Sequence, residues 1–370
     1  MQIYDTAAQR KVELDLGPVV RMYTCGITPY DAAHIGHASV YLTFDLLQRR
    51  LRDLGHQTLC VRNVTDVDDD ILRKSRELGV FYLDLAASEM AKFDKSMNAL
   101  EVVAPHSEPR ATSAISEILT LVDQLMSRGH AYRSGGSVYY DVTTAKDFGK
   151  ISHYSLETML ELAAERGGKP EDSNKRNPLD FILWQESAPG EPSWDSRWGS
   201  GRPGWHIECS ALAMRDLGET IDIHGGGSDL IFPHHECEAA QAESVTEKTF
   251  SRYWMHVGMV NLDGVKMSKS LGNLVFVGDL VEMHDPRVVR LAIISNHYRH
   301  PWEWRDELIS VAERRLSAII AAGVGDGALD EVRRAMDDDL DIPTALRAID
   351  IAIERGEGVS RAAELLGVRI

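Results

Sequence analysis

An apolar strand that leads into a glycine flanked by two histidines constrains the fold of this chain more than any other stretch. Residues 19–25 have the pattern of a buried strand, and His-Ile-Gly-His at 34–37 opens an amphipathic segment that predicts a helix over 40–54. A helix that begins soon after a strand presents free backbone N–H groups and the positive end of its dipole. This arrangement suits the phosphates of a nucleotide.

Later segments predict that this strand belongs to a parallel sheet. A second strand is expected over residues 57–62, and a polar run then leads to a helix that Gly79 should end. Further strands are expected over 220–224, which runs into three glycines, and over 254–262. Strand–helix–strand order favours an α/β fold whose ligands bind at the carboxyl ends of the strands.

The residues between the two parts of this sheet read as an insertion, and the end of the chain reads as helical. The elements predicted for the insertion are helices over 86–100 and 111–128, a strand over 137–142 and a polar loop over 165–177. An ordered loop over 184–203 is expected to lie over the nucleotide site. Residues 279–370 have a helical pattern, in which Asp341-Ile342-Pro343 should start a late helix.

The composition is that of a globular protein, and the lack of a long apolar run or a secretion signal leads us to expect a cytoplasmic one. Hydrophobic residues make up 44% of the chain and charged residues 26%, and no apolar run is long enough to span a bilayer. In a cytoplasmic chain the four cysteines are more often metal ligands, catalytic groups or core residues than disulfide partners. A net charge of −17 is weak evidence against RNA as a partner.

Two cysteines and a histidine form a candidate metal-binding set. Cys25 ends the first strand, Cys209 follows Trp205-His206-Ile207-Glu208, and His234 lies in a turn rich in proline and histidine. Two thiolates and an imidazole would make a zinc triad with one open position. On spacing alone, the favoured alternative is that the cysteines are core residues and His234 a loop residue. Glu238, four residues after His234, is open as a fourth ligand, a partner of the histidine or a surface residue.

A second motif identifies the family that the chain resembles. Lys266-Met267-Ser268-Lys269-Ser270 lies downstream of His34-Ile35-Gly36-His37, and the two in this order are the signature of class I aminoacyl-tRNA synthetases and their relatives. Segments 23–26, 201–210 and 222–235 resemble the cysteinyl-tRNA synthetase branch. The resemblance implies an α/β fold: a Rossmann nucleotide-binding domain with an inserted α+β connective region and a C-terminal helical region. The expected divisions are 1–88 and 196–275 for the two halves of the Rossmann domain, 89–195 for the insertion and 276–370 for the helical region.

Within this branch, the chain resembles the mycothiol ligases, which join cysteine to the amine of a glucosaminyl-inositol instead of to tRNA. The shared features are residues 26–31 and 34–38, the segment 164–170, and an end at residue 370 that leaves little room for an anticodon-binding domain. The resemblance implies a monomeric, ATP-dependent ligase that works through cysteinyl-adenylate, with no tRNA or membrane partner. At the position of Glu238 the ligases carry a small hydroxyl residue, so a compact cysteinyl-tRNA synthetase stays as the alternative.

The same resemblance implies roles for individual residues. His34, His37, Lys266 and Lys269 would be the catalytic residues around the phosphates of ATP, which Mg²⁺ accompanies. Cys25, Cys209 and His234 would hold one Zn²⁺, whose affinity for thiolate selects cysteine over serine. The residues implied for the cysteinyl-adenylate pocket are Cys25, Gly26, Ile27, Thr28, Val40, Asn63, Val64, Thr65, Trp205, Gly227, Ser228, Asp229 and Val260. Val40 is equally compatible with a purely core role, and the segment 165–170 with an acceptor contact or an ordinary turn.

Overall fold

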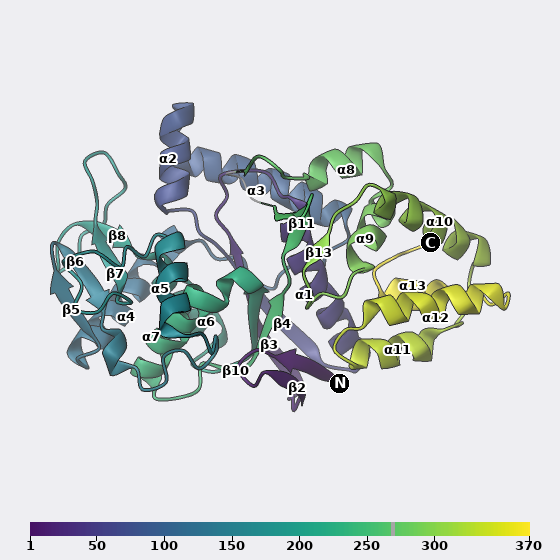
Figure 1. Cartoon of the computed structure of the whole chain (residues 1–370), viewed down its shortest axis with the longest axis horizontal. Helices are drawn as coiled ribbons and strands as arrows, with labels where there is room; N and C mark the ends of the chain where they lie inside the picture. Colours follow the sequence, from purple (N-terminus) through teal and green to yellow (C-terminus); the bar gives the residue numbers. More distant parts are fainter. Residues whose placement is uncertain (268–270) are drawn as a thin grey trace.

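A parallel sheet of four strands forms the centre of the molecule (Figure 1). The computed structural model describes residues 1–267 and 271–370. The strands follow the order β10–β9–β3–β4, and every neighbouring pair is parallel. Their bounds are Val19–Ile27 for β3, Gln57–Val64 for β4, Ile221–Gly227 for β9 and Ser251–Val257 for β10. Because β3 and β9 are neighbours, their carboxyl ends lie side by side, which is where ligands bind in open α/β sheets.

Helix α1 (Ile35–Asp53) begins within the histidine motif, five residues before the predicted start at residue 40. Its first turn is capped from within the motif. The His34 side chain accepts a hydrogen bond from the Gly36 N–H at 3.1 Å, and the His37 ring accepts one from the His34 N–H at 3.5 Å. Such caps satisfy backbone donors that would otherwise lack partners, so the helix can begin early.

The single strand predicted over 254–262 is wrong, because the chain changes sheets within it. Strand β10 ends at Val257, and β11 (Val260–Leu262) joins a second sheet with β12 (Val265–Lys266) and β13 (Trp302–Glu303). The break falls at Gly258, whose N–H donates to the Tyr298 carbonyl at 2.7 Å. A Cβ at this glycine would lie 2.5 Å from the His300 backbone, so the crossing segment packs directly on it.

Another sheet has four antiparallel strands in the order β5–β6–β7–β8, and the first three of them fall within the predicted insertion. These strands are Ala131–Ser134, Ser137–Tyr140, Phe181–Glu186 and Gly201–Pro203. The predicted strand over 137–142 therefore ends two residues early, where Asp141 caps the short helix η2 (Val142–Thr144). The loop expected over 184–203 is wrong at both ends, because its ends pair as β7 and β8. The apolar Trp184, which is fully buried, draws the chain into the sheet there.

Helices surround the two larger sheets. Those before β9 are α2 (Asp69–Leu78), α3 (Tyr82–Ala99), η1 (Ala111–Ala114), α4 (Ile115–Ser127), α5 (Leu156–Glu165) and α6 (Trp205–Leu217). Those after it are η3 (Ser228–Leu230), η4 (Ile231–His235), α7 (Glu236–Thr246), α8 (Val277–Met283), α9 (Pro286–Ile294), α10 (Glu307–Ala322), α11 (Leu329–Asp337), α12 (Ile342–Glu354) and α13 (Ser360–Leu365). The N-terminal strands β1 (Gln2–Asp5) and β2 (Arg10–Glu13) form a separate antiparallel pair.

The predicted stop at Gly79 and the late helix start at Asp341 are both confirmed, because Gly79 adopts φ +67° and the Asp341 side chain caps α12.

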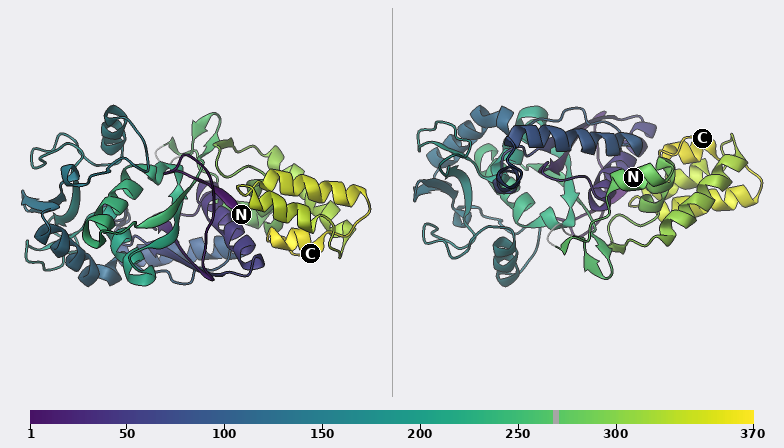
Figure 2. Two further views of the ribbon diagram at one scale, coloured as in Figure 1. Left: turned by 90° about the horizontal axis from the view of Figure 1, so that it is seen from below. Right: turned by 90° about the horizontal axis from the view of Figure 1, so that it is seen from above.

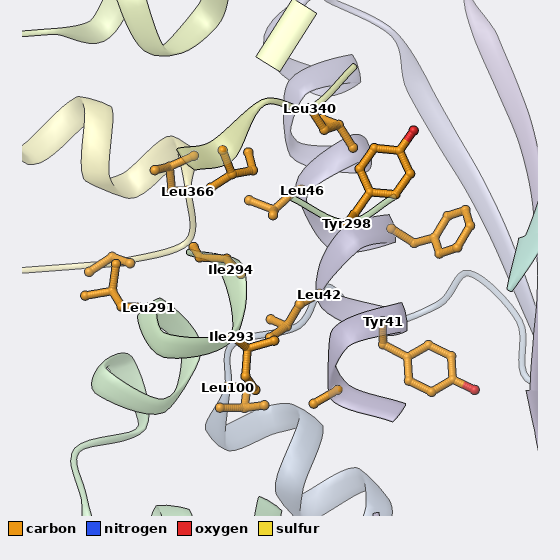
Figure 3. Close-up of a cluster of buried hydrophobic side chains, with 14 of the residues drawn as sticks. Tyr41, Leu42, Leu46, Leu100, Leu291, Ile293, Ile294, Tyr298, Leu340 and Leu366 are labelled. Atoms are coloured by element: carbon orange, nitrogen blue, oxygen red, sulfur yellow. The ribbon is translucent and has the colours of Figure 1, made fainter. Parts of the chain in front are cut away.

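The C-terminal helices and the antiparallel sheet lie at opposite ends of the molecule, with the parallel sheet between them (Figure 2). Helix α1 is held against the C-terminal helices by an apolar cluster that includes Leu42, Leu46, Ile293 and Leu340 (Figure 3). The helix that carries His37 is therefore part of a core shared with the end of the chain.

Among the described residues, no helix has both the length and the apolar character that crossing a membrane would require. The parallel sheet draws strands from both predicted halves of the Rossmann domain, and β5 to β7 lie between those halves. The divisions at residues 88, 195 and 275 stay predictions.

Candidate active site and metal centre

The carboxyl ends of β3 and β4 are tied together at a glycine. The Asn63 side-chain oxygen accepts a hydrogen bond from the Gly26 N–H at 2.8 Å, and its nitrogen donates to the Thr65 hydroxyl at 3.2 Å. A Cβ at Gly26 would lie 1.5 Å from the Asn63 carbonyl oxygen, so only glycine fits there. The Thr65 N–H also donates to the Ile27 carbonyl at 3.0 Å. The structure thus brings together the predicted pocket residues of these two strands, including Val64, which pairs with Ile27.

Beyond β3, Thr28 contacts an aspartate that the sequence analysis did not single out. The Thr28 hydroxyl donates to the Asp68 carboxylate at 3.0 Å, and the same carboxylate caps α2 by accepting from the Ile71 N–H at 2.9 Å. In the sequence, Asp68 stands just before a predicted helix, where aspartate is a preferred cap. That signal indicates a cap and gives no hint of the contact with Thr28.

The three predicted metal ligands meet in space, and Glu238 joins them. The ligand atoms of Cys25, Cys209, His234 and Glu238 all lie within 4.8 Å of one another, and all four residues are buried. The Glu238 carboxylate is 3.4 Å from the Cys25 sulfur and 3.0 Å from His234 Nε2. The ligand atoms of a tetrahedral zinc site lie roughly 3–4 Å apart. The spacing and the chemistry of these donors therefore fit a metal ion.

Further histidines surround this set. His224 Nε2 lies 2.8 Å from the second oxygen of Glu238, and His206 Nδ1 lies 2.9 Å from His234 Nδ1. His235 Nε2 is 3.3 Å from the Cys25 sulfur, so Cys25, His224, His235 and Glu238 form a second, overlapping group of possible ligands. From the sequence, His224 and His206 could reach the site without a ranking between them, and nothing marked His235, because the convergence of these rings depends on β9 lying beside β3 and on the turn η4.

The two signature motifs approach each other through the segment that follows the second one. The Ile35 N–H donates to the Val275 carbonyl at 3.0 Å, and the Val277 N–H donates to the Ala33 carbonyl at 2.9 Å. The rings of His34 and His37 lie 3.9 Å apart, and both residues are partly exposed at the start of α1. The two histidines therefore lie at the N-terminus of α1, where the first N–H groups already have partners within the protein.

Lys266 lies on the hairpin β11–β12, across from the glycine-rich end of β9. Its ammonium is 3.5 Å from the Asp229 carboxylate. The neighbouring Met267 N–H donates to the Val260 carbonyl at 3.0 Å, which places Val260 directly behind the motif. The predicted residue Lys269 lies outside the described residues.

Further predicted pocket residues border these groups. Val40 is half-buried, and its Cγ2 atom lies 4.0 Å from the point where a Cβ of Gly227 would be, so it faces the glycine-rich end of β9. Ser228 follows directly in η3. Trp205 stacks on the His234 ring with 4.3 Å between ring centroids. Its indole therefore connects the predicted adenylate pocket with the metal-ligand set.

Comparison with known proteins gives relatives over almost the whole chain. A protein of Thermobispora bispora is 48% identical over 357 residues, which are 95% of this chain and 89% of the relative. A protein of Streptomyces griseus subsp. griseus is 47% identical over 391 residues, covering 100% of this chain and 96% of the relative. Both are named L-cysteine:1D-myo-inositol 2-amino-2-deoxy-alpha-D-glucopyranoside ligase. Residues 13–314 match the family model of the class I tRNA synthetase (C) catalytic domain. The chain belongs to the ligase branch of this class I family.

Solved structures agree with the class I fold. Methionyl-tRNA synthetase of Mycobacterium tuberculosis, solved with methionyl-adenylate, superimposes with a TM-score of 0.67 over 91% of this chain and 82% of that one, at 18% identity. LeuRS of Agrobacterium radiobacter, in a ternary complex with tRNA and LeuAMS, gives 0.66 over 95% and 83%, at 11% identity. The predicted fold class and the predicted family are confirmed.

The metal-ligand set of this class I domain carries interacting charges. Burial alone would raise the pKa of Glu238, but His224 and His234 lower it well below its usual value. Burial opposes the charge on His234, yet the Glu238 carboxylate raises the pKa of this histidine to about 10. For Cys209, burial is outweighed by its contact with Cys25 and by the charge of His234, and the pKa falls to about 6. The ligase thus has a thiol that readily becomes the thiolate that metals bind.

Proposed function

We propose that this chain activates L-cysteine with ATP as cysteinyl-adenylate and joins the cysteinyl group to the amine of a glucosaminyl-inositol. The curated relatives at 47–48% identity bear the name of this ligase activity. The observation that carries the proposal is that a possible metal-ligand set and the histidine motif lie at the end of one strand. Cys25 at the end of β3 belongs to a buried, thiol-containing metal set, and the same strand leads to the helix N-terminus at His34 and His37.

The metal in this proposal is Zn²⁺, held by Cys25, Cys209 and His234. Two sulfurs and an imidazole are the ligands that zinc prefers, and Glu238 is close enough to complete the set in the absence of substrate. His224 holds the other oxygen of Glu238 and so orients the carboxylate. Bound zinc would take the substrate thiol as a thiolate, which the hydroxyl of serine cannot match.

The first step joins the cysteine carboxylate to the α-phosphate of ATP and releases pyrophosphate. Class I synthetases use ATP with Mg²⁺. In the proposal, the phosphates lie at the positive end of the α1 dipole and contact the rings of His34 and His37. Lys266 and Lys269 neutralise the departing pyrophosphate. Positioning and charge neutralisation are then the main contributions of the protein to this step.

The remaining pocket residues would hold the adenylate. Thr28 and Thr65 offer hydroxyls beside the amino acid, and Asp229 offers a carboxylate for its ammonium group. Since Asp229 pairs with Lys266 in this structure, substrate binding would give each of them a new partner. Trp205 provides a flat apolar wall.

In the second step, the amine nitrogen of the acceptor forms a bond to the activated carbonyl carbon. The bond between that carbon and the phosphate oxygen breaks, AMP leaves, and the nitrogen gives up a proton. This reaction yields an amide. The predicted monomeric state and the place of segment 165–170 near the acceptor stay predictions.

A product assay tests the proposal against the tRNA alternative. The purified chain is supplied with cysteine, ATP and either glucosaminyl-inositol or tRNA, and the products are followed by mass spectrometry. Cysteinyl-glucosaminyl-inositol with unmodified tRNA is the expected result. Cysteinylated tRNA with no sugar product would overturn it, and cysteine-dependent pyrophosphate exchange with neither product would require a different amine as acceptor.

A further inference from the structure

A cavity beside α2 is lined by none of the described residues that we assign to cysteine, ATP or the metal. Its volume is about 640 Å³, and ligand pockets in proteins measure roughly 300–1,000 Å³. One wall comes from α2 and the start of α3, with Leu72, Arg76, Phe81 and Tyr82. The other wall is the segment 190–194, in the loop between β7 and β8. The cavity is therefore available for a further substrate.

Ion pairs hold the two walls of this cavity together. The Glu191 carboxylate accepts from Arg76 at 3.1 Å and from Arg202 at 3.4 Å, one arginine from α2 and the other from β8. Arg202 also pairs with Asp69 in the first turn of α2. The side chains of Glu191 and Arg202 are 12% and 6% exposed, so the contact between them is shielded from water. The loop is thus fixed against α2, and the cavity has a defined shape.

Helix α2 connects this cavity with the proposed reaction site. Its cap, Asp68, accepts at 3.0 Å from the hydroxyl of Thr28, a residue of the proposed adenylate pocket. The Leu72 N–H donates to the Asp68 carbonyl at 3.2 Å, so Leu72 stands one helical turn beyond Asp68, and Arg76 follows about one turn later. With a rise of about 1.5 Å per residue, Asp68 and Arg76 lie about 12 Å apart along the helix. A molecule lying along this face would thus extend from Thr28 into the cavity.

The walls of the cavity suit a hydroxylated ring. Phe81 is apolar but 58% exposed, and its ring packs edge to face on Tyr82 with 4.8 Å between the centroids. An exposed apolar surface with a polar rim is typical of a binding site. The C–H groups of a sugar or cyclitol can pack on such rings, while its hydroxyls hydrogen-bond to charged groups such as Arg76 and Glu191. The cavity therefore matches a ligand that is apolar on its faces and polar at its edges.

The charges around the cavity favour an amine over a nucleic acid. Among the described residues that line it, Arg76 is the only cation, and Glu191 already pairs with it. Nucleic acids bind through phosphates, which several cations would have to neutralise. By contrast, the Asp68 carboxylate accepts from two uncharged donors, the Thr28 hydroxyl and the Ile71 N–H, and can attract an ammonium group. An amino sugar therefore fits this surface better than tRNA does.

We propose that the acceptor lies along α2, with its amine at Thr28 and Asp68 and its inositol ring in the cavity. The inference rests on the proposed function, which supplies a glucosaminyl-inositol as the acceptor. In this arrangement, cysteine and ATP bind at the strand ends, whereas the inositol ring contacts only α2, α3 and the loop between β7 and β8. Contacts in the cavity therefore contribute to the KM for the acceptor and not to the KM for cysteine.

The test compares Phe81→Ala with the wild-type chain in the two half-reactions. The expected result is an approximately tenfold higher KM for glucosaminyl-inositol in amide formation, because an aromatic packing surface is lost. The KM for cysteine in pyrophosphate exchange should keep its wild-type value. Phe81→Tyr retains the ring, so this variant should restore the wild-type KM for the acceptor.

Ile320→Ala is the matched control. Ile320 is also a large apolar residue that is 47% exposed, but it lies on α10 and does not line the cavity. This variant should keep both KM values. A wild-type KM for the acceptor in Phe81→Ala would overturn the inference, and so would an equal rise of both KM values. A wild-type chain that forms no cysteinyl-sugar would instead overturn the proposed function itself.

Discussion

The Lys266 ammonium lies 3.5 Å from the Asp229 carboxylate, so the second signature motif contacts the glycine-rich end of β9 before any substrate is present. Both side chains are partly exposed, and such a pair contributes little to stability. The pair therefore keeps two groups with opposite tasks at the rim of the proposed site. When substrates bind, Lys266 would leave this pair to contact the pyrophosphate, and Asp229 would leave it to contact the ammonium group of cysteine.

Lys266→Ala is expected to slow adenylate formation about 100-fold and to change the KM for cysteine little, because the lysine acts on the charge that develops in the transition state. Asp229→Asn should mainly raise the KM for cysteine. Cysteine-dependent pyrophosphate exchange measures both variants. Equal effects of the two changes on kcat and KM would contradict this division of roles.

Cys209→Ser is expected to lose bound zinc and cysteine activation together, because serine offers no soft ligand to the set of Cys25, Cys209 and His234. Metal analysis of the purified protein and pyrophosphate exchange are the two measurements. Cys60→Ser serves as the control, since Cys60 is also buried and lies outside the possible ligand groups found among the described residues. Full zinc occupancy in Cys209→Ser would refute the assignment.

Asp68 should make the chain less stable as the pH rises. Burial raises the pKa of this carboxyl group from 3.8 to about 6, so the folded state favours its protonated form. The stabilisation that the protonated carboxyl group contributes is complete below its pKa in the unfolded chain. It is lost between about pH 4 and pH 6, and the loss amounts to about 3 kcal/mol of unfolding free energy. Asp68→Asn keeps a helix cap and removes this titration.

Urea unfolding at several pH values compares Asp68→Asn with the wild type. The difference in unfolding free energy, variant minus wild type, should increase by up to about 3 kcal/mol between pH 4 and pH 7. A difference that does not change with pH would show that Asp68 titrates alike in the folded and unfolded states.

Arg290 and Asp45 form a fully buried ion pair that joins α9 to α1. Arg290 also donates to the Leu366 and Leu100 carbonyls, each at 2.8 Å. Arg290→Met is expected to cost about 3–5 kcal/mol of unfolding free energy, because it leaves a buried charge and two carbonyls without this partner. Denaturant unfolding measures the change. The exposed pair of Arg361 and Asp326 provides the control, since Arg361→Met should change stability by less than about 0.5 kcal/mol.

The sequence by itself determined the local structure and the chemistry of the separate motifs. Apolar runs predicted β3, β4 and the start of β9, and Gly79 and Asp341 marked the helix ends as the structure has them. These features depend on a few neighbouring residues, so a local pattern is enough to predict them. The two signature motifs likewise identified the family, which the relatives confirm.

Only the tertiary structure decided which side chains meet. From the sequence, Glu238 could be a fourth metal ligand, a partner of His234 or a surface residue. In the structure, the packing of α7 beside β3 and β9 buries its side chain between His224, His234 and Cys25. The contact of Thr28 with Asp68 also joins segments that are distant in sequence. The break at Gly258 was missed for the same reason. It depends on the segment at Tyr298, 40 residues later in the chain, which packs on this glycine. Local patterns set strands and helices, whereas the order of strands in the sheet brings the residues of a site together.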